Sequence, residues 1–239
     1  MKKSYRNLLL IYLLLFCINL SAQRNKKPQN LPKYDFKKIH FGFTIGINEL
    51  DFDIKKNINT LINDTLLSIE GKSQKGFNLG IVSNFRIGKY SDLRFIPTLV
   101  FGERQLNYIY KDSVGANSIG EETKRIESTL IDFPIYIKYK SARYNNFRTY
   151  VLAGLKYSLD VASKDKVNDR KNELVKLKEN DLLAEIGFGL DFYLEYFKFS
   201  PQIKIAYGIL NIVTDNENKY NDPISRLNTN GWMLSFTFE

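Results

Sequence analysis

Cysteine is almost absent from this chain of 239 residues, and its scarcity limits how the protein can be stabilised. The single cysteine, Cys17, lies inside the hydrophobic N-terminal run. Once that run is removed, the chain has neither a disulfide framework nor a cysteine metal site, whatever the redox state of its compartment. Its stability must therefore come from hydrogen bonds and packing.

Long apolar runs are also lacking. The N-terminal run covers residues 8–20, which is too short for a helix that crosses a bilayer, because such a helix needs roughly 20 apolar residues. Basic residues precede the run and small ones follow it: Lys2, Lys3 and Arg6, then Ser21-Ala22. This order is typical of a secretory signal peptide. We therefore expect residues 1–22 to be a signal peptide cleaved after Ala22, with Cys17 as part of its apolar region rather than a lipidation site.

Positive charge exceeds negative charge. Acidic residues are absent from residues 1–22, so cleavage lowers the formal net charge from +9 to +6. Such a surplus fits a solvated basic surface or an anionic partner. Because the chain is expected to be exported, we exclude nucleic acid as that partner. Residues 23–38 are especially basic and contain Pro28 and Pro32, a composition that cannot bury a core. We predict a basic periplasmic tail, which is either a solvated linker or a contact to anionic lipid head groups or a partner.

From residue 39 onward the hydrophobic pattern has a period of two. In the first segment Phe41, Phe43 and Ile45 alternate with small or polar residues. Successive side chains of a β-strand point to opposite faces, so this alternation predicts strands with one apolar face. The pattern covers residues 39–48, 77–88, 93–104, 131–140, 147–159, 182–192, 197–208 and 232–238.

The lengths of these segments and of their connections predict a membrane barrel. Roughly 10 residues is the length of a tilted strand that crosses a bilayer. Short connections (residues 89–92, 141–146 and 194–196) alternate with long ones (51–75, 109–127, 160–180 and 211–228). Both termini then lie on the side of the short turns, which is periplasmic in outer-membrane barrels. We expect an all-β fold, an eight-stranded antiparallel up-and-down transmembrane β-barrel over residues 39–239, in the outer membrane.

A soluble barrel of the lipocalin type would show the same alternation with its apolar face inward. The other face argues against it, because its glycines and charged residues suit the crowded lumen of a small membrane barrel. The predicted lumen polar network is Arg86, Arg94, Arg104, Asp132, Lys138, Arg148, Lys156, Glu185, Asp191 and Lys204. Tyrosines near the strand ends resemble aromatic girdles. They are Tyr90, Tyr139, Tyr144, Tyr193 and Tyr196 on the turn side and Tyr108, Tyr110, Tyr157 and Tyr207 on the loop side.

Three prolines, Pro97, Pro134 and Pro201, lie inside predicted strands. Proline has no N–H to donate to a strand ladder, and a closed barrel has no free edge where this loss would be harmless. We therefore expect a local bulge at each of the three prolines.

Residues for catalysis are scarce. Outer-membrane barrel enzymes use a histidine with serine or aspartate near the loop end, but the one histidine, His40, begins the first strand on the turn side. Lumen carboxylates are outnumbered by lumen bases, which favours ion pairs over catalysis, and the interior of eight strands has room for side chains rather than for a pore. Gly187 and Gly189 are interpreted as sites of close packing. We predict no enzyme, no cofactor or metal, and no small-molecule substrate.

Several segments resemble a known superfamily. Similarity to the Bacteroidota outer-membrane barrel superfamily lies in IDFPIYIKY (131–139), YVLAGLKY (150–157) and LSFTFE (234–239). Within it, the PorT (SprT) proteins of the type IX secretion system are resembled by AEIGFGLDFY (184–193) and FSPQIKIAYGI (199–209). The resemblance implies a non-enzymatic component needed for protein export across the outer membrane and, in species that glide, for gliding motility. It also implies partners among other type IX components, besides outer-membrane lipid.

Two alternatives stay open at this point. A small outer-membrane adhesin, a receptor or a purely structural barrel would share the fold without the secretion role. Within residues 51–75, a group of apolar side chains fits either a strand that continues above the membrane or a partner site: Leu61, Ile62, Leu66, Leu67 and Ile69.

Overall fold

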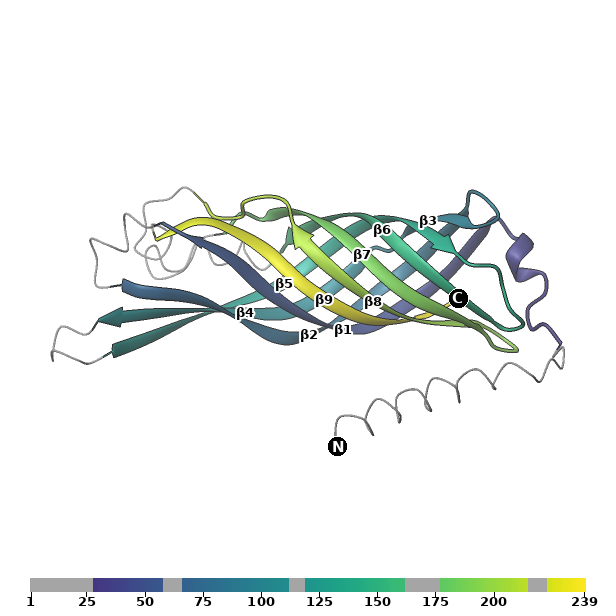
Figure 1. Ribbon diagram of the computed structural model, residues 1–239, viewed down its shortest axis with the longest axis horizontal. Coiled ribbons are helices and arrows are strands. Elements are labelled where there is room, and N and C mark those ends of the chain that lie inside the picture. The colour runs from purple at the N-terminus through teal and green to yellow at the C-terminus, as the bar shows by residue number, and fades with distance from the viewer. Residues whose placement is uncertain (1–27, 58–65, 112–118, 162–176, 215–222) are drawn as a thin grey trace, which may run out of the picture.

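Figure 1 shows a computed structural model in which long tilted strands form a barrel. The structure describes residues 28–57, 66–111, 119–161, 177–214 and 223–239. The predicted signal peptide, with Cys17, lies outside these residues. Within the described ranges, no helix combines the length and the apolar character that a membrane span requires.

The described residues form one short 3₁₀ helix and nine strands. The helix is η2 (Tyr34–Phe36). The strands are β1 (Ile39–Lys56), β2 (Leu66–Arg86), β3 (Ser91–Phe95), β4 (Thr98–Lys111), β5 (Ile119–Lys140), β6 (Phe147–Asp160), β7 (Asn180–Tyr193), β8 (Lys198–Gly208) and β9 (Ile224–Phe238).

The strands pair antiparallel with their neighbours, and the sheet closes on itself. Ile47 of β1 is paired with Phe77 of β2 on one side and with Leu234 of β9 on the other. β3 and β4 share the neighbours β2 and β5, so they are two parts of one strand position. The nine-stranded sheet is therefore an eight-stranded antiparallel up-and-down barrel, which confirms the predicted fold class. Its two ends are called the turn end, with the short connections and both termini of the barrel, and the loop end.

The prolines interrupt the ladders without bulges. The prediction of a local bulge at each proline is therefore wrong. β3 and β4 are separated at Pro97, yet the register with β5 is the same on both sides of the gap. The carbonyl of Pro134 accepts a hydrogen bond from the Ile96 N–H at 3.4 Å, so the Pro134 nitrogen faces the same gap. Near Pro201 the ladder with β7 also skips pairs at constant register. A missing N–H removes hydrogen bonds but requires no inserted residue, which explains why the register is kept.

The large apolar side chains point outward. Phe41, Ile81 and Ile137 are 70%, 64% and 60% exposed, whereas the inward-facing Thr44 and Arg94 are buried. A soluble barrel would have the opposite arrangement. An apolar outer wall is the arrangement that a lipid environment requires.

At the loop end the two faces exchange character. Along β1 the inner face changes from Asn48 to Leu50 and Phe52, while the outer face changes from Ile47 to Glu49. The buried apolar residues there form one cluster, called the loop-end cluster: Phe52, Leu66, Ile69, Leu106, Tyr108, Ile212, Val213, Ile224 and Leu227. An apolar interior with a polar exterior is the arrangement that water favours. The strands therefore continue beyond the lipid-facing wall.

The strands are consequently longer than the sequence predicted. Residues 51–75 and 109–127 are interpreted as loops from the sequence alone, but they belong largely to β1, β2, β4 and β5. The interpretation as loops is therefore wrong. It followed the outward apolar face, which ends where the wall meets water although the ladder continues. Leu66 and Ile69 are buried in a strand that continues past the wall, as one of the two alternatives predicted, whereas Leu61 and Ile62 lie outside the described residues.

Three strands project together at the loop end, as Figure 1 shows for β2, β4 and β5. Pairing of β1 with β2 ends at Leu50 and Gln74, whereas β2 and β4 stay paired as far as Leu66 and Tyr110. β5 remains paired with β4 over the same stretch. This three-stranded sheet, residues 66–73, 104–111 and 119–126, is called the loop-end extension.

The aromatic girdles are only partly as predicted. The exposed tyrosines of the outer wall are Tyr90, Tyr139, Tyr144 and Tyr196 toward the turn end and Tyr157 and Tyr207 toward the loop end. Tyr193 is buried in the lumen, while Tyr108 and Tyr110 stack at the loop-end cluster. These three side chains face inward. Nearness to a strand end does not reveal which way a side chain points.

Candidate functional site

Lys138 and Asp191 form a buried ion pair inside the lumen. The Lys138 Nζ lies 2.9 Å and 3.0 Å from the two carboxylate oxygens of Asp191, and both side chains are 1% exposed. The Ser200 hydroxyl donates to Asp191 at 2.7 Å, and the Lys138 Nζ is 3.5 Å from the centre of the Tyr150 ring. Side chains from four strands, β5 to β8, thus meet across the lumen.

A second set of contacts surrounds Lys156. Its Nζ lies 2.7 Å from Glu185 Oε1 and 3.1 Å from Asp132 Oδ2. The Lys204 Nζ is 3.6 Å from Glu185 Oε2, and the Tyr136 hydroxyl donates to Glu185. The predicted lumen carboxylates therefore face lysines, an arrangement of ion pairs rather than of groups free to exchange protons.

Arg104 lies at the loop-end limit of this polar interior. Its guanidinium donates to the Ser128 hydroxyl at 2.7 Å and is 3.6 Å from the Asp160 carboxylate. The same group lies 4.5 Å from the centre of the Phe52 ring, which belongs to the loop-end cluster. Arg104 therefore marks the boundary between the polar lumen and the apolar interior above it.

Residues 28–38, the described part of the predicted tail and here called the N-terminal segment, fold across the turn end instead of forming a solvated linker. The Asn30 backbone N–H donates to Asn146 Oδ1 at 2.9 Å, and the Asn30 side-chain amide donates to the Tyr193 carbonyl at 3.0 Å. Arg143 donates to the Asn30 carbonyl. Residues 28–38 are thus held by side-chain to backbone hydrogen bonds, which composition does not reveal.

Tyr34 closes one side of the turn end. Its ring stacks on His40 with 3.9 Å between ring centroids, and its hydroxyl donates to Glu239 at 2.8 Å. Glu239 also contacts Arg94, and lies 2.7 Å from the Lys198 Nζ. Burial alone would raise the pKa of Glu239, but the charges of Arg94 and Lys198 outweigh it and hold the pKa well below its usual value. Burial and the Glu239 carboxylate raise the pKa of Tyr34 far above its usual value, so the phenol remains a donor.

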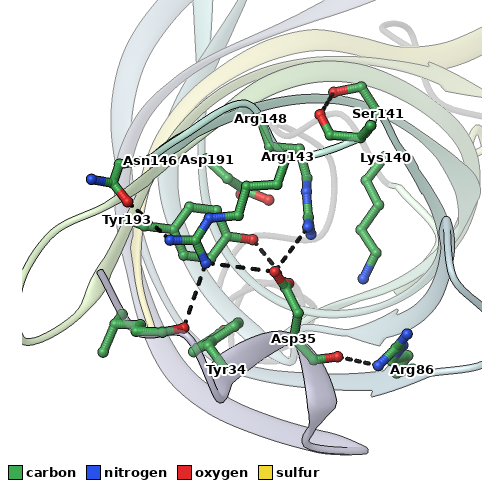
Figure 2. A network of polar contacts seen from close by, with 12 residues as sticks. Tyr34, Asp35, Arg86, Lys140, Ser141, Arg143, Asn146, Arg148, Asp191 and Tyr193 are labelled. Carbon is green, nitrogen blue, oxygen red and sulfur yellow. Dashed lines mark hydrogen bonds and ion pairs between the residues drawn. The ribbon is translucent and has the colours of Figure 1, made fainter. Parts of the chain in front are cut away.

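Asp35 closes the other side, as Figure 2 shows. Its carboxylate lies 3.1 Å from Arg148 and 3.5 Å from Arg143, and it accepts a hydrogen bond from the Tyr193 hydroxyl at 3.2 Å. Arg86 donates to the Asp35 carbonyl. Burial would raise the pKa of Asp35, but the Arg148 and Arg143 charges outweigh it and lower the pKa below its usual value. The segment is therefore fastened by a charged contact as well as by backbone bonds.

The predicted polar residues thus fall into separate sets. Six of them meet in the contacts around Lys138 and around Lys156: Asp132, Lys138, Lys156, Glu185, Asp191 and Lys204. Arg104 lies at the loop end, and Arg86, Arg94 and Arg148 lie at the turn end. Sequence reasoning missed the partners Tyr34, Asp35, Lys140, Arg143, Lys198 and Glu239. One signal was available, because Asp35 is the single acidic residue of the basic stretch 23–38.

The geometry favours structural roles over catalysis. His40 faces the lumen at the turn end, where its Nε2 lies 2.8 Å from the Tyr34 carbonyl oxygen. In the part of the chain that the structure describes, no three His, Cys, Asp or Glu residues gather as a metal site would require. The Tyr150 ring lies against Gly189, where any Cβ would overlap it, and Gly187 has Leu152 and Lys204 as close neighbours. Both glycines therefore make room for lumen side chains.

The chain matches a family model and is similar to several solved structures. A family model described as outer membrane protein beta-barrel domain matches residues 21–214. The outer membrane protein OprG of Pseudomonas aeruginosa is 14% identical, with a TM-score of 0.45 over 84% of this chain and 94% of its own. Neisserial surface protein A is 12% identical, with a TM-score of 0.42 over 84% and 98%. Ail of Yersinia pestis, solved with the heparin analogue sucrose octasulfate, is 12% identical, with a TM-score of 0.35 over 84% and 99%. No curated protein matches the chain.

Proposed function

This chain belongs to the outer-membrane protein β-barrel domain family, and from that premise we propose that it is a non-enzymatic outer-membrane component that acts by binding other proteins. We propose further that it serves the type IX secretion system, in protein export across the outer membrane and, where present, in gliding motility. The finer assignment is supported by the sequence motifs of residues 131–139, 150–157, 184–193, 199–209 and 234–239.

The filled lumen carries this proposal. Arg94 and Tyr136 are 0% exposed and Lys138 is 1% exposed. Lys138 and Tyr136 contact Asp191 and Glu185 of β7, two strands away, and Arg94 contacts Glu239. Residues 28–38 also cover the turn end. A small barrel filled in this way has no room for a solute path, so its activity has to reside on its outer surfaces.

The loop-end extension is the surface best suited to a partner. It stands clear of the lipid-facing wall, and the loop-end cluster supports its inner face. Its outer strands are β2 and β5. β2 still contacts β1 there, since Lys56 donates to the Ser68 hydroxyl at 2.9 Å, whereas β5 continues beyond its pairing with β6. Strand edges of this kind bind extended segments of other chains by adding a strand. We propose that both mature termini are periplasmic, that cleavage follows Ala22, and that the extension faces outward from the cell.

Gene deletion tests the secretion role. The spent medium of the deletion strain should lose exported proteins, and the wild-type gene should restore them. A complementing variant with alanine on the exposed positions of β5 in the extension should restore less: Glu121, Thr123 and Arg125. A matched variant with alanine at exposed turn-end positions should restore export fully: Lys33, Lys37 and Lys38. Unchanged export in the deletion strain would refute the secretion role.

A small adhesin or receptor is the second candidate, and the projection of β2, β4 and β5 from the wall favours it. The two candidates differ in the phenotype expected when the loop-end extension is altered, which is loss of export for the first and loss of attachment for the second. If the same triple alanine variant lost attachment to surfaces while the secreted proteins stayed unchanged, the adhesin function would replace the secretion role.

A further inference from the structure

A cavity of about 260 Å³ opens at the turn end, between the turns and the N-terminal segment. It is much larger than the roughly 10–15 Å³ that admits one water molecule. Five basic side chains and one carboxylate line it: Arg86, Lys89, Lys140, Arg143, Arg148 and Asp35. Lys89 is exposed at its rim, whereas Lys140 and Arg148 are 7% exposed within it.

The charges around this cavity do not balance. Asp35 is its one lining carboxylate, and it is shared between Arg143 and Arg148. Lys140 is paired outside the lining with Asp92, at 2.6 Å. Such an excess of positive charge beside a low-dielectric protein wall attracts anions.

Arg148, one of the lining residues, also carries a buried donor that no described residue satisfies. The Arg148 Nε is buried and has no hydrogen-bond partner among the described residues, although buried donors almost always have one. In Figure 2 the ends of Arg148, Lys140 and Arg86 turn toward the same space beside Asp35. The unsatisfied N–H therefore belongs to a side chain that lines a basic, solvent-accessible cavity.

We propose that this cavity binds an oxyanion of the phosphate class. Planar guanidinium groups match the oxygens of phosphate and donate to them in pairs, and lysine adds a mobile point charge. Arg86, Arg148 and Lys89 would surround such a group, while Asp35 stays in contact with both Arg148 and Arg143. The phosphate is either free or part of an anionic lipid head group, and both sources present the same oxygens. The site is independent of any role in export.

The test uses the whole mature chain, folded in zwitterionic detergent, with inorganic phosphate as the first probe in titration calorimetry. The second probe is phosphatidylglycerol, in nanodiscs of phosphatidylcholine with and without it, with bound lipid measured by native mass spectrometry. The variant is Arg86→Gln with Lys89→Gln, which leaves the buried arginines in place. Lys111→Gln, at the exposed end of β4, is the control. Heat-dependent gel mobility verifies that every variant is folded.

Saturable phosphate binding that weakens at least about tenfold in the double variant, and not in the control, is the expected result. If inorganic phosphate does not bind but phosphatidylglycerol is retained by the wild type and lost by the double variant, the ligand is the lipid head group. Binding should weaken with added salt, since the contacts are charged. The proposal is overturned if neither probe binds, or if the double variant binds as well as the wild type.

Discussion

Removing one charge from the Lys138–Asp191 pair tests the ion-paired lumen directly. Lys138→Met keeps most of the side-chain volume but deletes the ammonium that lies 2.9 Å from Asp191. The Asp191 carboxylate is then left buried, with the Ser200 hydroxyl as a donor at 2.7 Å. The ammonium contact with the Tyr150 ring is lost as well.

The size of the effect follows from burial. Removing one partner of a buried ion pair costs about 3–5 kcal/mol, because the other charge stays desolvated. Both side chains are 1% exposed, so solvent screening does not reduce this cost. With a urea dependence of about 2 kcal/mol per M, the unfolding midpoint should fall by about 2 M.

The chain supplies its own probe for this measurement. Trp232 is the single tryptophan and is 37% exposed on the outer wall of β9, so its emission changes when the barrel leaves lipid. Urea titrations in lipid vesicles, followed by Trp232 emission, give the free energy of unfolding for each variant. Lys75→Met, at an exposed position of β2, is the matched control and should change stability by less than about 0.5 kcal/mol.

The double variant Lys138→Met with Asp191→Leu separates lost pairing from lost packing. Replacing both charges removes the unpaired carboxylate, so most of the lost stability should return. If Lys138→Met unfolds at the same urea concentration as the wild type, the pair is not desolvated as described. The single variant Asp191→Leu is measured as well. If the double variant loses more free energy of unfolding than the two single variants lose in sum, packing rather than charge is responsible.

Three further results are expected. Gly189→Ala should lower the free energy of unfolding by about 1–3 kcal/mol, because the Tyr150 ring must move. Gly88→Ala is the control and should have no effect, since a Cβ there has no neighbour within 4 Å. Equal urea midpoints for the two variants would contradict the packing of Tyr150 against Gly189. The lowered pKa of Asp35 means that its contribution is complete above its ordinary value of 3.8 and is lost as the pH falls through the lower folded value. A nitroxide on Lys33→Cys should therefore become mobile only below about pH 3.8, and already at neutral pH with Asp35→Asn; immobility under both conditions would exclude the charged contact. His40→Ala should raise the mobility of the same label, through loss of the Tyr34 stack, without changing the heat-dependent gel mobility of the barrel.

The sequence was sufficient for the class of fold. The outer wall must be apolar at every second residue, because lipid offers no hydrogen bonds, and that requirement repeats along each strand. The same alternation placed charged residues such as Lys138 and Asp132 on the opposite face. The alternation of short and long connections then fixed an even strand count and the common end for both termini.

The pairing of those charges needed the tertiary structure. Lys156 meets Asp132 and Glu185 from two different neighbouring strands, and strand register decides which side chains lie opposite each other. Likewise, Asp35 reaches Arg143 and Arg148 across a turn far along the chain. Composition described the tail as basic and unable to form a core, and it did not reveal that residues 28–38 hydrogen-bond to the turn end of the barrel.

The loop-end extension shows the same division between what the sequence determined and what the tertiary structure decided. An outward apolar face identifies a strand only while its surroundings are lipid. Past Ile47 the surroundings become water, so the apolar side chains turn to the inside, as Leu50 and Phe52 do. The sequence alone determined a membrane barrel with a charged interior. The closed sheet decided how far its strands continue, which charges meet, and what covers its turn end, because each depends on contacts between strands distant in sequence.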